Sequence, residues 1–291
     1  MAFEVFDALV FAGGGCRCFW QVGFFDALAE RDAELLAPRY IVGVSAGSAM
    51  ATMLHAGGTT SARALFAKLT AANDKNVYPE RLLRRGEPVM PHLGMYRAAL
   101  RAAFDAAALA RLAAAPPIDV LLARPPRWLP WMPGLLLGFG AYMLERRFRD
   151  GVHPSWPATM GFYPELVRVQ EVIADHGRDP EAAREALVAL VLASSCTPPV
   201  TPFLRWADRP VFDGGLYDNV PDFAVPSDCA RTLVMLTRRY PSHKLPREAG
   251  KVFVQPSQPI PIDKWDYTSP ELLNETYLLG RRDGEAFAAA V

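Results

Sequence analysis

The feature of this sequence that could do chemistry is a serine placed between two glycines. Ser45 follows an apolar run at residues 40–44, with Gly43 two positions before it and Gly47 two positions after it. A helix-compatible run comes next, which gives the serine the strand–turn–helix context of a Gly-x-Ser-x-Gly nucleophile elbow. That turn is too tight for side chains at the flanking positions, and it exposes the serine hydroxyl near a helix N-terminus, whose dipole favours negative charge. The alternative is an ordinary turn in which Ser45 caps the helix.

Three consecutive glycines form a second candidate element near the N-terminus. An apolar run at residues 5–12 ends at Gly13, Gly14 and Gly15, and residues 19–29 show helical spacing. A strand, a glycine loop and a helix in this order bring backbone N–H groups close to an anion.

The anion that this loop could bind depends on the residues around it. A dinucleotide-binding loop would need glycine in place of Cys18 and an acid at the end of the second strand, and a phosphate-binding loop would need Gly-Lys-Ser/Thr. The sequence has neither pattern. An oxyanion hole for Ser45 fits, because adjacent parallel strands present their loops at the same edge of a sheet. Arg17 would position this loop or add positive potential, unless it is a solvated arginine at the start of a helix.

A third candidate element is an acid followed by two glycines. Two short runs, residues 203–206 and 210–212, are spaced for a β-hairpin that leads to Asp213, Gly214 and Gly215. Taken alone, such a triplet is most often only a turn. If it lies next to the elbow, the two glycines would let the backbone pack close to the serine.

A serine hydroxyl needs a base to take its proton, and the sequence offers two arrangements. In one, Asp213 orients His243, in the chain order Ser45, Asp213, His243 of the α/β-hydrolases. That fold places several strands before its elbow, whereas only one precedes Ser45 here, and His243 is in a polar loop. In the other arrangement Asp213 contacts Ser45 directly, with a dry pocket raising its pKa and nearby donors keeping it ionised. Both arrangements stay open from these residues alone.

Taken together, the motifs resemble those of the patatin-like phospholipase family, over roughly residues 5–226. The oxyanion loop, nucleophile elbow and Asp-Gly-Gly/Ala motif of that family are similar to Gly13-Gly14-Gly15-Cys16-Arg17, Gly43-Val44-Ser45-Ala46-Gly47 and Asp213-Gly214-Gly215. Two further segments also resemble the family, Ala193-Ser194-Ser195 before Pro198-Pro199 and Asn219-Val220-Pro221. One departure is Cys18, where the family usually has glycine.

The resemblance implies a three-layer α/β/α fold with a mostly parallel central sheet. It also implies acyl-ester hydrolysis on lipids without a metal or other cofactor, with Ser45 as the nucleophile and Asp213 as the general base. The residues implied to bind the oxyanion are Gly13, Gly14, Gly15 and Arg17, and those implied to support the motifs are Gly43, Gly47, Gly214 and Gly215.

Composition limits the remaining function classes. The chain has 291 residues, of which 51% are hydrophobic, so we expect a folded protein with a sizeable core. Zero formal net charge and the absence of a long Lys/Arg run argue against nucleic-acid binding. Acids near the N-terminus argue against a secretory signal, so we expect a cytoplasmic protein with reduced cysteines. Cys16 and Cys18 are too closely spaced for an ordinary zinc knuckle, and we expect no metal site.

The other elements are predicted from periodicity and from proline and glycine positions. Residues 231–237 and 251–254 indicate buried strands. Helices are predicted at residues 61–72, 95–115, 162–176 and 180–192, with a closing helix at 270–291 that is broken near Gly280.

Composition changes between residues 116 and 149, where prolines, tryptophans and a long apolar stretch occur. The uncharged window at residues 128–144 is at the lower limit of membrane-spanning length and has prolines in its first half. A hydrophobic cap over the site is favoured over a spanning helix, and a lipid-facing surface with interfacial tryptophans and arginines is the other interpretation.

We therefore predict one catalytic domain at residues 1–226, including a helix-rich apolar insertion at about 116–149, with residues 227–291 completing the same domain. The predicted function is a serine acyl hydrolase that cleaves phospholipids or related acyl lipids, with peripheral membrane contact. The alternatives are a lipid-binding protein with little turnover, which Cys18 would favour, and a soluble esterase or thioesterase with a Ser45–Asp213–His243 triad.

Overall fold

A computed structural model describes residues 5–31, 36–83, 87–127, 140, 151–153, 156–177 and 179–290. Within these residues an eight-stranded sheet has the order β5-β6-β3-β2-β1-β7-β8, with β4 also paired to β3. The strands are β1 (Phe6–Phe11), β2 (Leu36–Val44), β3 (Ile118–Arg124), β4 (Tyr163–Arg168), β5 (Leu204–Trp206), β6 (Arg209–Asp213), β7 (Thr232–Met235) and β8 (Lys251–Val254).

The centre of the sheet is parallel. Strands β3, β2, β1, β7 and β8 pair in parallel, whereas β4 and β6 run antiparallel to β3, and β5 forms a hairpin with β6. Because β1 and β2 are parallel neighbours, the glycine loop after β1 and the turn after β2 lie at the same edge of the sheet. Strand β6 reaches this edge from the opposite direction, and Asp213 at its end pairs with Leu122 of β3.

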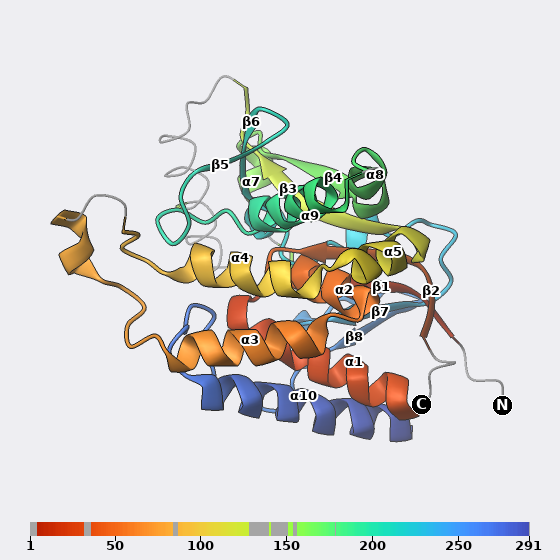
Figure 1. Ribbon diagram of the computed structural model, residues 1–291. Helices are drawn as coiled ribbons and strands as arrows, with labels where there is room; N and C mark the ends of the chain where they lie inside the picture. The colour runs from red at the N-terminus through yellow and green to blue at the C-terminus, as the bar shows by residue number, and fades with distance from the viewer. Residues whose placement is uncertain are drawn as a thin grey trace.

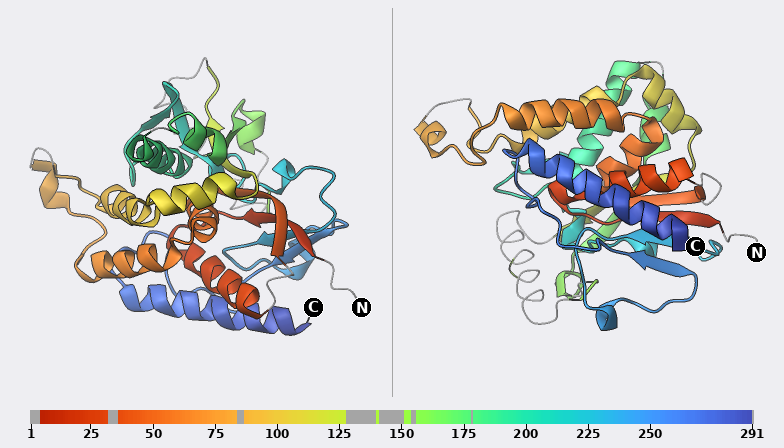
Figure 2. Two further views of the ribbon diagram at one scale, coloured as in Figure 1. Left: turned by 45° about the vertical axis from the view of Figure 1, so that its right-hand side comes forward. Right: turned by 90° about the horizontal axis from the view of Figure 1, so that it is seen from below.

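Helices cover one face of this sheet, as Figures 1 and 2 show. The helices of the described residues are α1 (Phe19–Arg31), α2 (Ala46–Ala56), α3 (Thr59–Ala71), α4 (His92–Ala103), α5 (Ala106–Ala114), α8 (Val169–Ala174), α9 (Pro180–Ser194) and α10 (Pro270–Ala290), together with the short α7 (Trp156–Thr159), which lies on the other side of the sheet (Figure 2). Short 3₁₀ helices are η1 (Gly15–Cys18), η3 (Pro79–Leu83), η4 (Gly214–Leu216), η5 (Asp222–Ala224) and η6 (Ser242–Lys244).

The core follows the alternation of the strands. Leu9 and Phe11 of β1 belong to the large cluster against the helices, and Val10 belongs to a smaller cluster on the other face. In the described residues the second face is covered by loops around η5 and η6, which supply Val220 and Tyr240 to that smaller cluster. The predicted α/β class with a mostly parallel sheet is confirmed.

Three sequence predictions about single elements were wrong. The helix predicted at residues 95–115 is two helices, α4 and α5, which are separated at Phe104 and Asp105 because Asp105 caps the start of α5. Residues 163–168, predicted as helix, form β4, because Pro164 disfavours a helix interior and β3 offers them a partner along six residue pairs. Helix α10 is continuous through Gly280. A Cβ at Gly280 would lie 2.1 Å from the carbonyl oxygen of Trp20, so this glycine allows α10 to pack closely on α1 and does not mark a break.

The predicted apolar insertion requires one correction. Its first part contains residues 118–124, which form the buried strand β3 beside β2. The apolar window at 128–144 falls outside the described residues, apart from position 140. Among the residues that the structure does describe, no helix combines the length and the apolar character needed to cross a bilayer.

Candidate active site

Ser45 lies at the tip of the turn between β2 and α2. Its φ of 54° and ψ of −134° are unusual for a residue other than glycine, which is the backbone strain that a tight strand-to-helix turn imposes. The backbone N–H and the hydroxyl of Ser48 both donate to the carbonyl oxygen of Ser45, at 3.0 and 2.6 Å, and so fix the first turn of α2. Ser45 is 8% exposed, so its hydroxyl is held within the protein.

The two glycines of the elbow are required by close packing. A Cβ at Gly43 would lie 2.7 Å from Cα of Ser48, and a Cβ at Gly47 would lie 2.4 Å from the carbonyl oxygen of Phe11. The elbow therefore packs directly on its own helix and on the end of β1.

Asp213 is in direct contact with the serine. The Ser45 hydroxyl donates to Asp213 Oδ2 at 2.6 Å, the Thr197 hydroxyl donates to the same oxygen at 3.1 Å, and the Gly215 N–H donates to Oδ1 at 2.7 Å. Burial raises the pKa of Asp213, and these hydrogen bonds together with the positive charge of Lys264 oppose that rise. The carboxyl group is thus a stronger base than an exposed aspartate and is still supported in its ionised form.

The glycine loop after β1 lies beside the elbow. Gly13 is fixed by its N–H donating to the Asn219 carbonyl oxygen at 3.1 Å, while its own carbonyl accepts from Asn219 Nδ2 at 2.9 Å and from the Thr237 hydroxyl. Gly15 has a φ of +58°, a conformation that favours glycine. In the described part of the chain, the N–H groups of Gly14 and Gly15 donate no backbone hydrogen bond, which leaves them available to an anion.

Several residues around the site have structural roles that the motifs did not reveal. Ser194 accepts from the Ser45 N–H at 2.8 Å and donates to the Leu121 carbonyl at 2.7 Å, tying the elbow to β3 and α9. Ser194 and Asn219 lie in segments that resemble the family, whereas Thr237 and Thr197 belong to no motif. Thr237 closely follows the end of β7. Its position just after a strand at this edge of the sheet is the sequence feature that could have indicated a place in the site.

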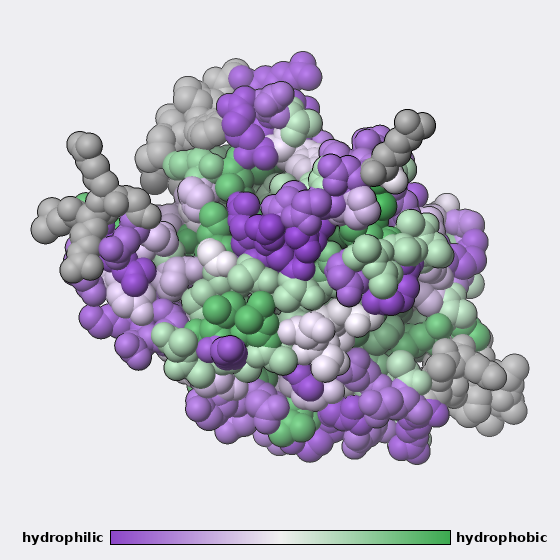
Figure 3. Space-filling view, in the orientation of Figure 1, coloured by the Kyte–Doolittle hydropathy of each residue, from purple (hydrophilic) through white to green (hydrophobic). Residues whose placement is uncertain are grey.

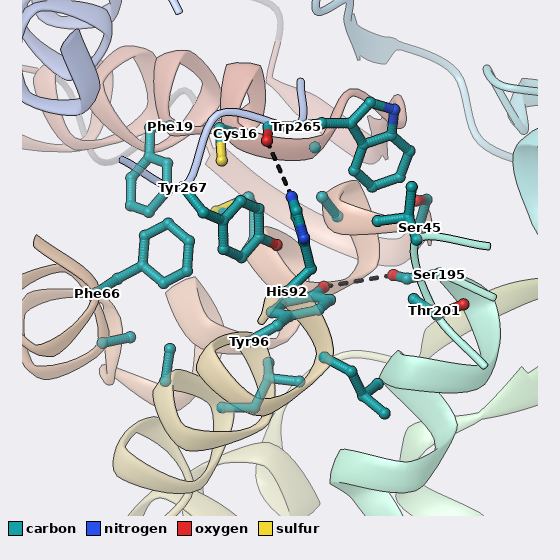
Figure 4. Close-up of a pocket in the computed structure, with 18 of the residues that line it drawn as sticks. Cys16, Phe19, Ser45, Phe66, His92, Tyr96, Ser195, Thr201, Trp265 and Tyr267 are labelled. Atoms are coloured by element: carbon teal, nitrogen blue, oxygen red, sulfur yellow. Dashed lines mark hydrogen bonds between the residues drawn. The ribbon is translucent and has the colours of Figure 1, made fainter. Parts of the chain in front are cut away.

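A predominantly apolar cavity opens on one side of Ser45. It contains about 650 Å³ of empty space when the open solvent at its mouth is included, and its walls come from η1, α1, α2, α3, α4, the segment after α9 and the segment before α10. Figure 4 shows Ser45 at one end of this cavity and Phe19 and Phe66 at the other. In Figure 3, hydrophobic residues gather over α3 and α4, the helices that contribute Ala62, Phe66, Ala99 and Leu100 to its wall. We call this cavity the apolar chamber.

A histidine lies in the middle of the apolar chamber without being a candidate base. His92 Nε2 donates to the Trp265 carbonyl oxygen at 2.9 Å, and the ring packs against Tyr267 with centroids 4.3 Å apart (Figure 4). Burial lowers the pKa of His92, so the ring is neutral and adds to the apolar lining.

A second cavity opens on the other side of Ser45. It contains about 760 Å³ of empty space when the open solvent at its mouth is included, and it is lined by the glycine loop and Asp213 together with Arg17, Arg238 and Lys264. Ser45, Gly15 and Trp265 line both cavities. We call this second cavity the cationic chamber.

The structure bears on two questions from the sequence, namely whether Cys18 fits the glycine loop and whether His243 is near Ser45. Cys18 is buried, and it is not among the positive-φ residues of the described chain, so cysteine fits where the family usually has glycine. His243 is exposed in η6 and lines neither chamber. Of the predicted residues, the structure brings together Ser45, Asp213 and the loops that hold Gly13, Gly14, Gly15 and Arg17.

The described residues thus combine a mixed α/β sheet, a serine on a strained strand-to-helix elbow and a carboxylate that accepts a hydrogen bond from the serine hydroxyl. The family model of patatin-like phospholipases matches residues 9–222, and the chain belongs to this family, whose members are lipid acyl hydrolases. A comparison with curated proteins gave no match.

Proposed function

We propose that this protein is a serine acyl hydrolase that cleaves acyl esters of lipids through a Ser45–Asp213 dyad. The observation that carries the proposal is the 2.6 Å hydrogen bond from the Ser45 hydroxyl to Asp213 Oδ2, made at the tip of the elbow. A base must be within hydrogen-bond reach of the proton that it removes, and Asp213 meets this condition without a histidine between them.

The first half of the reaction forms an acyl-enzyme. Ser45 Oγ bonds to the ester carbonyl carbon while its proton passes to Asp213. The developing oxyanion is stabilised by the N–H groups of Gly14 and Gly15, with added positive potential from Arg17. The C–O bond to the alcohol then breaks, and the leaving oxygen takes the proton from Asp213.

The second half releases the fatty acid by the same groups. Water enters where the alcohol left and gives a proton to Asp213 as its oxygen attacks the acyl carbon. The bond to Ser45 Oγ breaks, and the proton returns from Asp213 to the serine. Thr197 is a positioning residue in both halves, because its hydroxyl holds the Asp213 oxygen that exchanges the proton.

The apolar chamber supports a lipid as the acyl donor. Its wall is made almost wholly of carbon, and it begins at Ser45, so an acyl chain can extend from the reacting carbonyl toward Phe19 and Phe66. We also propose peripheral contact with a lipid surface, because the substrates of such an enzyme reside in membranes. Leu82, 75% exposed in η3, is on a segment that projects from the body of the protein (Figure 1) and is suited to that contact.

The dyad predicts an acid limb in the pH profile of kcat/KM. Activity requires ionised Asp213, and burial raises its pKa above the ordinary 3.8, so activity should fall as the pH decreases through a value above 3.8. Lys264 lowers this pKa by its charge. We therefore expect Lys264→Gln to shift the acid limb to higher pH. A limb near the ordinary histidine value that disappears in His243→Ala would show a triad instead.

The apolar chamber predicts a limit on chain length. Ala99 lines the chamber from α4, so Ala99→Leu should reduce kcat/KM for a decanoyl nitrophenyl ester by about tenfold and change the butyryl ester less than about twofold. Ala98→Leu is the matched control, since Ala98 is on the same helix and does not line the chamber. Equal effects of Ala99→Leu on both esters would mean that the acyl chain binds elsewhere.

The function itself is tested with the wild-type protein. We expect it to release fatty acid from phospholipid vesicles and short-chain nitrophenyl esters, and a fluorophosphonate to block both reactions. A folded wild-type protein that neither reacts with the fluorophosphonate nor turns over any ester would refute the hydrolase and favour a lipid-binding protein.

A further inference from the structure

Five ionisable side chains form a network beside the smaller hydrophobic cluster of the sheet. His153 Nδ1 lies 3.0 Å from Asp218 Oδ2, and His153 Nε2 lies 3.7 Å from Asp222 Oδ1. Lys251, at the start of β8, donates to Asp222 Oδ2 at 2.9 Å and also pairs with Glu248. None of the five lines either chamber, and the proposed reaction does not use them.

The two aspartates of this network are buried, so each needs a cation to compensate its charge. Asp218 is 7% exposed and Asp222 is 4% exposed. Lys251 compensates Asp222. In the described part of the chain, His153 is the only basic side chain that forms an ion pair with Asp218. A buried carboxylate that loses its counter-charge is strongly destabilising, so the protonation of His153 decides whether Asp218 is compensated.

The pH range of the ion pair follows from the pKa values of its two members. Burial lowers the pKa of His153, but the hydrogen bond to Asp218 and the charges of the surrounding acids outweigh it and raise this pKa above the ordinary 6.5. Besides Asp218, those acids are Asp222 and Glu248. Burial also raises the pKa of Asp218 above 3.8, against the lowering effect of His153. The pair is therefore complete at pH 6.5 and is lost as the pH rises through the higher pKa of His153.

Asp218 lies between the proposed base and the residue that holds the glycine loop. Its N–H donates to the Gly214 carbonyl at 3.0 Å, and its Oδ1 accepts from the Val220 N–H at 2.9 Å. Between them, Asn219 fixes Gly13 by two hydrogen bonds, one from its side chain and one to its carbonyl oxygen. The two residues pack so closely that a Cβ at Gly13 would lie 2.6 Å from Asn219 Oδ1. A displacement of Asp218 is therefore transmitted to the glycine loop.

The position of His153 is set by its neighbour in the chain. Val152 is 3% exposed and belongs to the smaller cluster together with Val220 and Tyr240. The histidine thus approaches Asp218 from a segment that is packed on the sheet. Its own side chain is 33% exposed, so it can exchange protons with the solvent.

From these contacts we propose that protonated His153 positions the glycine loop, acting through Asp218 and Asn219. This rests on the proposed function and adds a control by pH to the same site. When His153 loses its proton, the Asp218 carboxylate stays buried without a cation, and the segment that fixes the glycine loop shifts. The oxyanion is then less well stabilised, which lowers kcat. KM changes little, because His153 lines neither chamber.

The first test is the pH profile of kcat with nitrophenyl butyrate. We expect wild-type kcat to fall about tenfold as the pH rises through a value above 6.5, with KM changed less than about twofold. His153→Gln should be about tenfold less active at neutral pH and should lack this alkaline limb, because glutamine is neutral at every pH. His153→Lys should keep the activity and move the limb to higher pH, because lysine holds its proton to higher pH than histidine.

A second substitution distinguishes lost charge compensation from a general structural defect. Asp218→Asn keeps a carbonyl oxygen for the Val220 N–H and removes the buried charge. Combined with His153→Gln, it should restore kcat to within about threefold of wild type and leave no alkaline limb. A double variant as inactive as His153→Gln alone would show that His153 does not act through the charge of Asp218, and the proposal would be wrong.

His243→Gln is the matched control, because it is the same substitution at an exposed histidine that lines neither chamber. It should leave kcat within about twofold of wild type at every pH. An active wild-type protein without an alkaline limb, or a limb that persists in His153→Gln, would overturn the inference and leave the hydrolase proposal intact. A wild-type protein that neither reacts with a fluorophosphonate nor turns over any ester at any pH would instead refute the proposed function.

Discussion

Replacing either member of the dyad should abolish ester hydrolysis without unfolding the protein. Ser45→Ala removes the nucleophile, and we expect kcat/KM to fall on the order of a millionfold, to the background rate. Asp213→Asn keeps the shape of the side chain but cannot accept the serine proton, and a loss of about a thousandfold is expected. Initial rates with a nitrophenyl ester measure both effects.

The stability of Asp213→Asn serves as an internal check. Because burial raises the pKa of Asp213, the folded state favours the neutral carboxyl, and ionisation at neutral pH costs stability. That cost is present above the folded pKa and declines as the pH falls toward the unfolded value. The amide that replaces the carboxyl group is neutral at every pH, so the variant should melt no lower than wild type at pH 7.

His243→Ala is the control that separates a dyad from a triad. His243 is exposed in η6 and lines neither chamber, so its loss should change kcat/KM less than about twofold. A loss of a thousandfold in His243→Ala, with a smaller loss in Asp213→Asn, would contradict direct proton transfer from Ser45 to Asp213.

The second large effect is expected at the elbow glycine of α2. Gly47→Ala should destabilise the protein by about 3 kcal/mol and remove most of its activity. The added Cβ would lie 2.4 Å from the Phe11 carbonyl and 2.5 Å from the Ala12 carbonyl, both backbone atoms at the end of β1. Relief of these clashes requires the elbow to move away from the glycine loop. Chemical denaturation and ester turnover report the two effects.

Gly94→Ala is the matched control, because Gly94 is also a helical glycine. A Cβ there would meet nothing within 4 Å, so the variant should gain about 0.5–1 kcal/mol from helix propensity and keep full activity. If Gly47→Ala were as stable as Gly94→Ala, the elbow would not be packed on β1 as described, and the geometry of the oxyanion site would be wrong.

Much of the site could be predicted from local sequence, because each motif specifies the shape of its own turn or loop. The spacing of Gly43, Ser45 and Gly47 describes a single turn, and one strand before it suffices to place the glycine loop alongside. The position of Asp213 was less determined by its neighbours. Its contact with Ser45 depends on an antiparallel strand that returns to the sheet beside β3, and the resemblance to a family supplied what spacing could not.

The parts that the sequence did not predict depend on contacts between distant segments. Residues 163–168 became a strand because β3 had an edge to pair, and Gly280 stayed helical because it packs on Trp20. The segment at residues 264–267 had no periodicity to mark it, yet Trp265 lines both chambers. These features depend on contacts with segments that are distant in the sequence, and a local sequence pattern does not record such contacts.

Different parts of the chain supply the motifs of the site and the walls of the chambers. The family match at residues 9–222 contains the elbow, the glycine loop and Asp213. Strands β7 and β8 then extend the sheet from β1, and the loops after them complete the chamber walls with Arg238, Lys264 and Trp265. The later part of the chain thus contributes residues to the walls of both chambers as well as strands to the sheet.

The most direct test of the dyad is peptide mass spectrometry after treatment with a fluorophosphonate. We expect one phosphonyl adduct on Ser45 in the wild-type protein and in His243→Ala, none in Ser45→Ala, and labelling slowed by about a thousandfold in Asp213→Asn. An adduct on a different residue, or labelling of Asp213→Asn at the wild-type rate, would contradict the assignment of Ser45 as the nucleophile activated by Asp213.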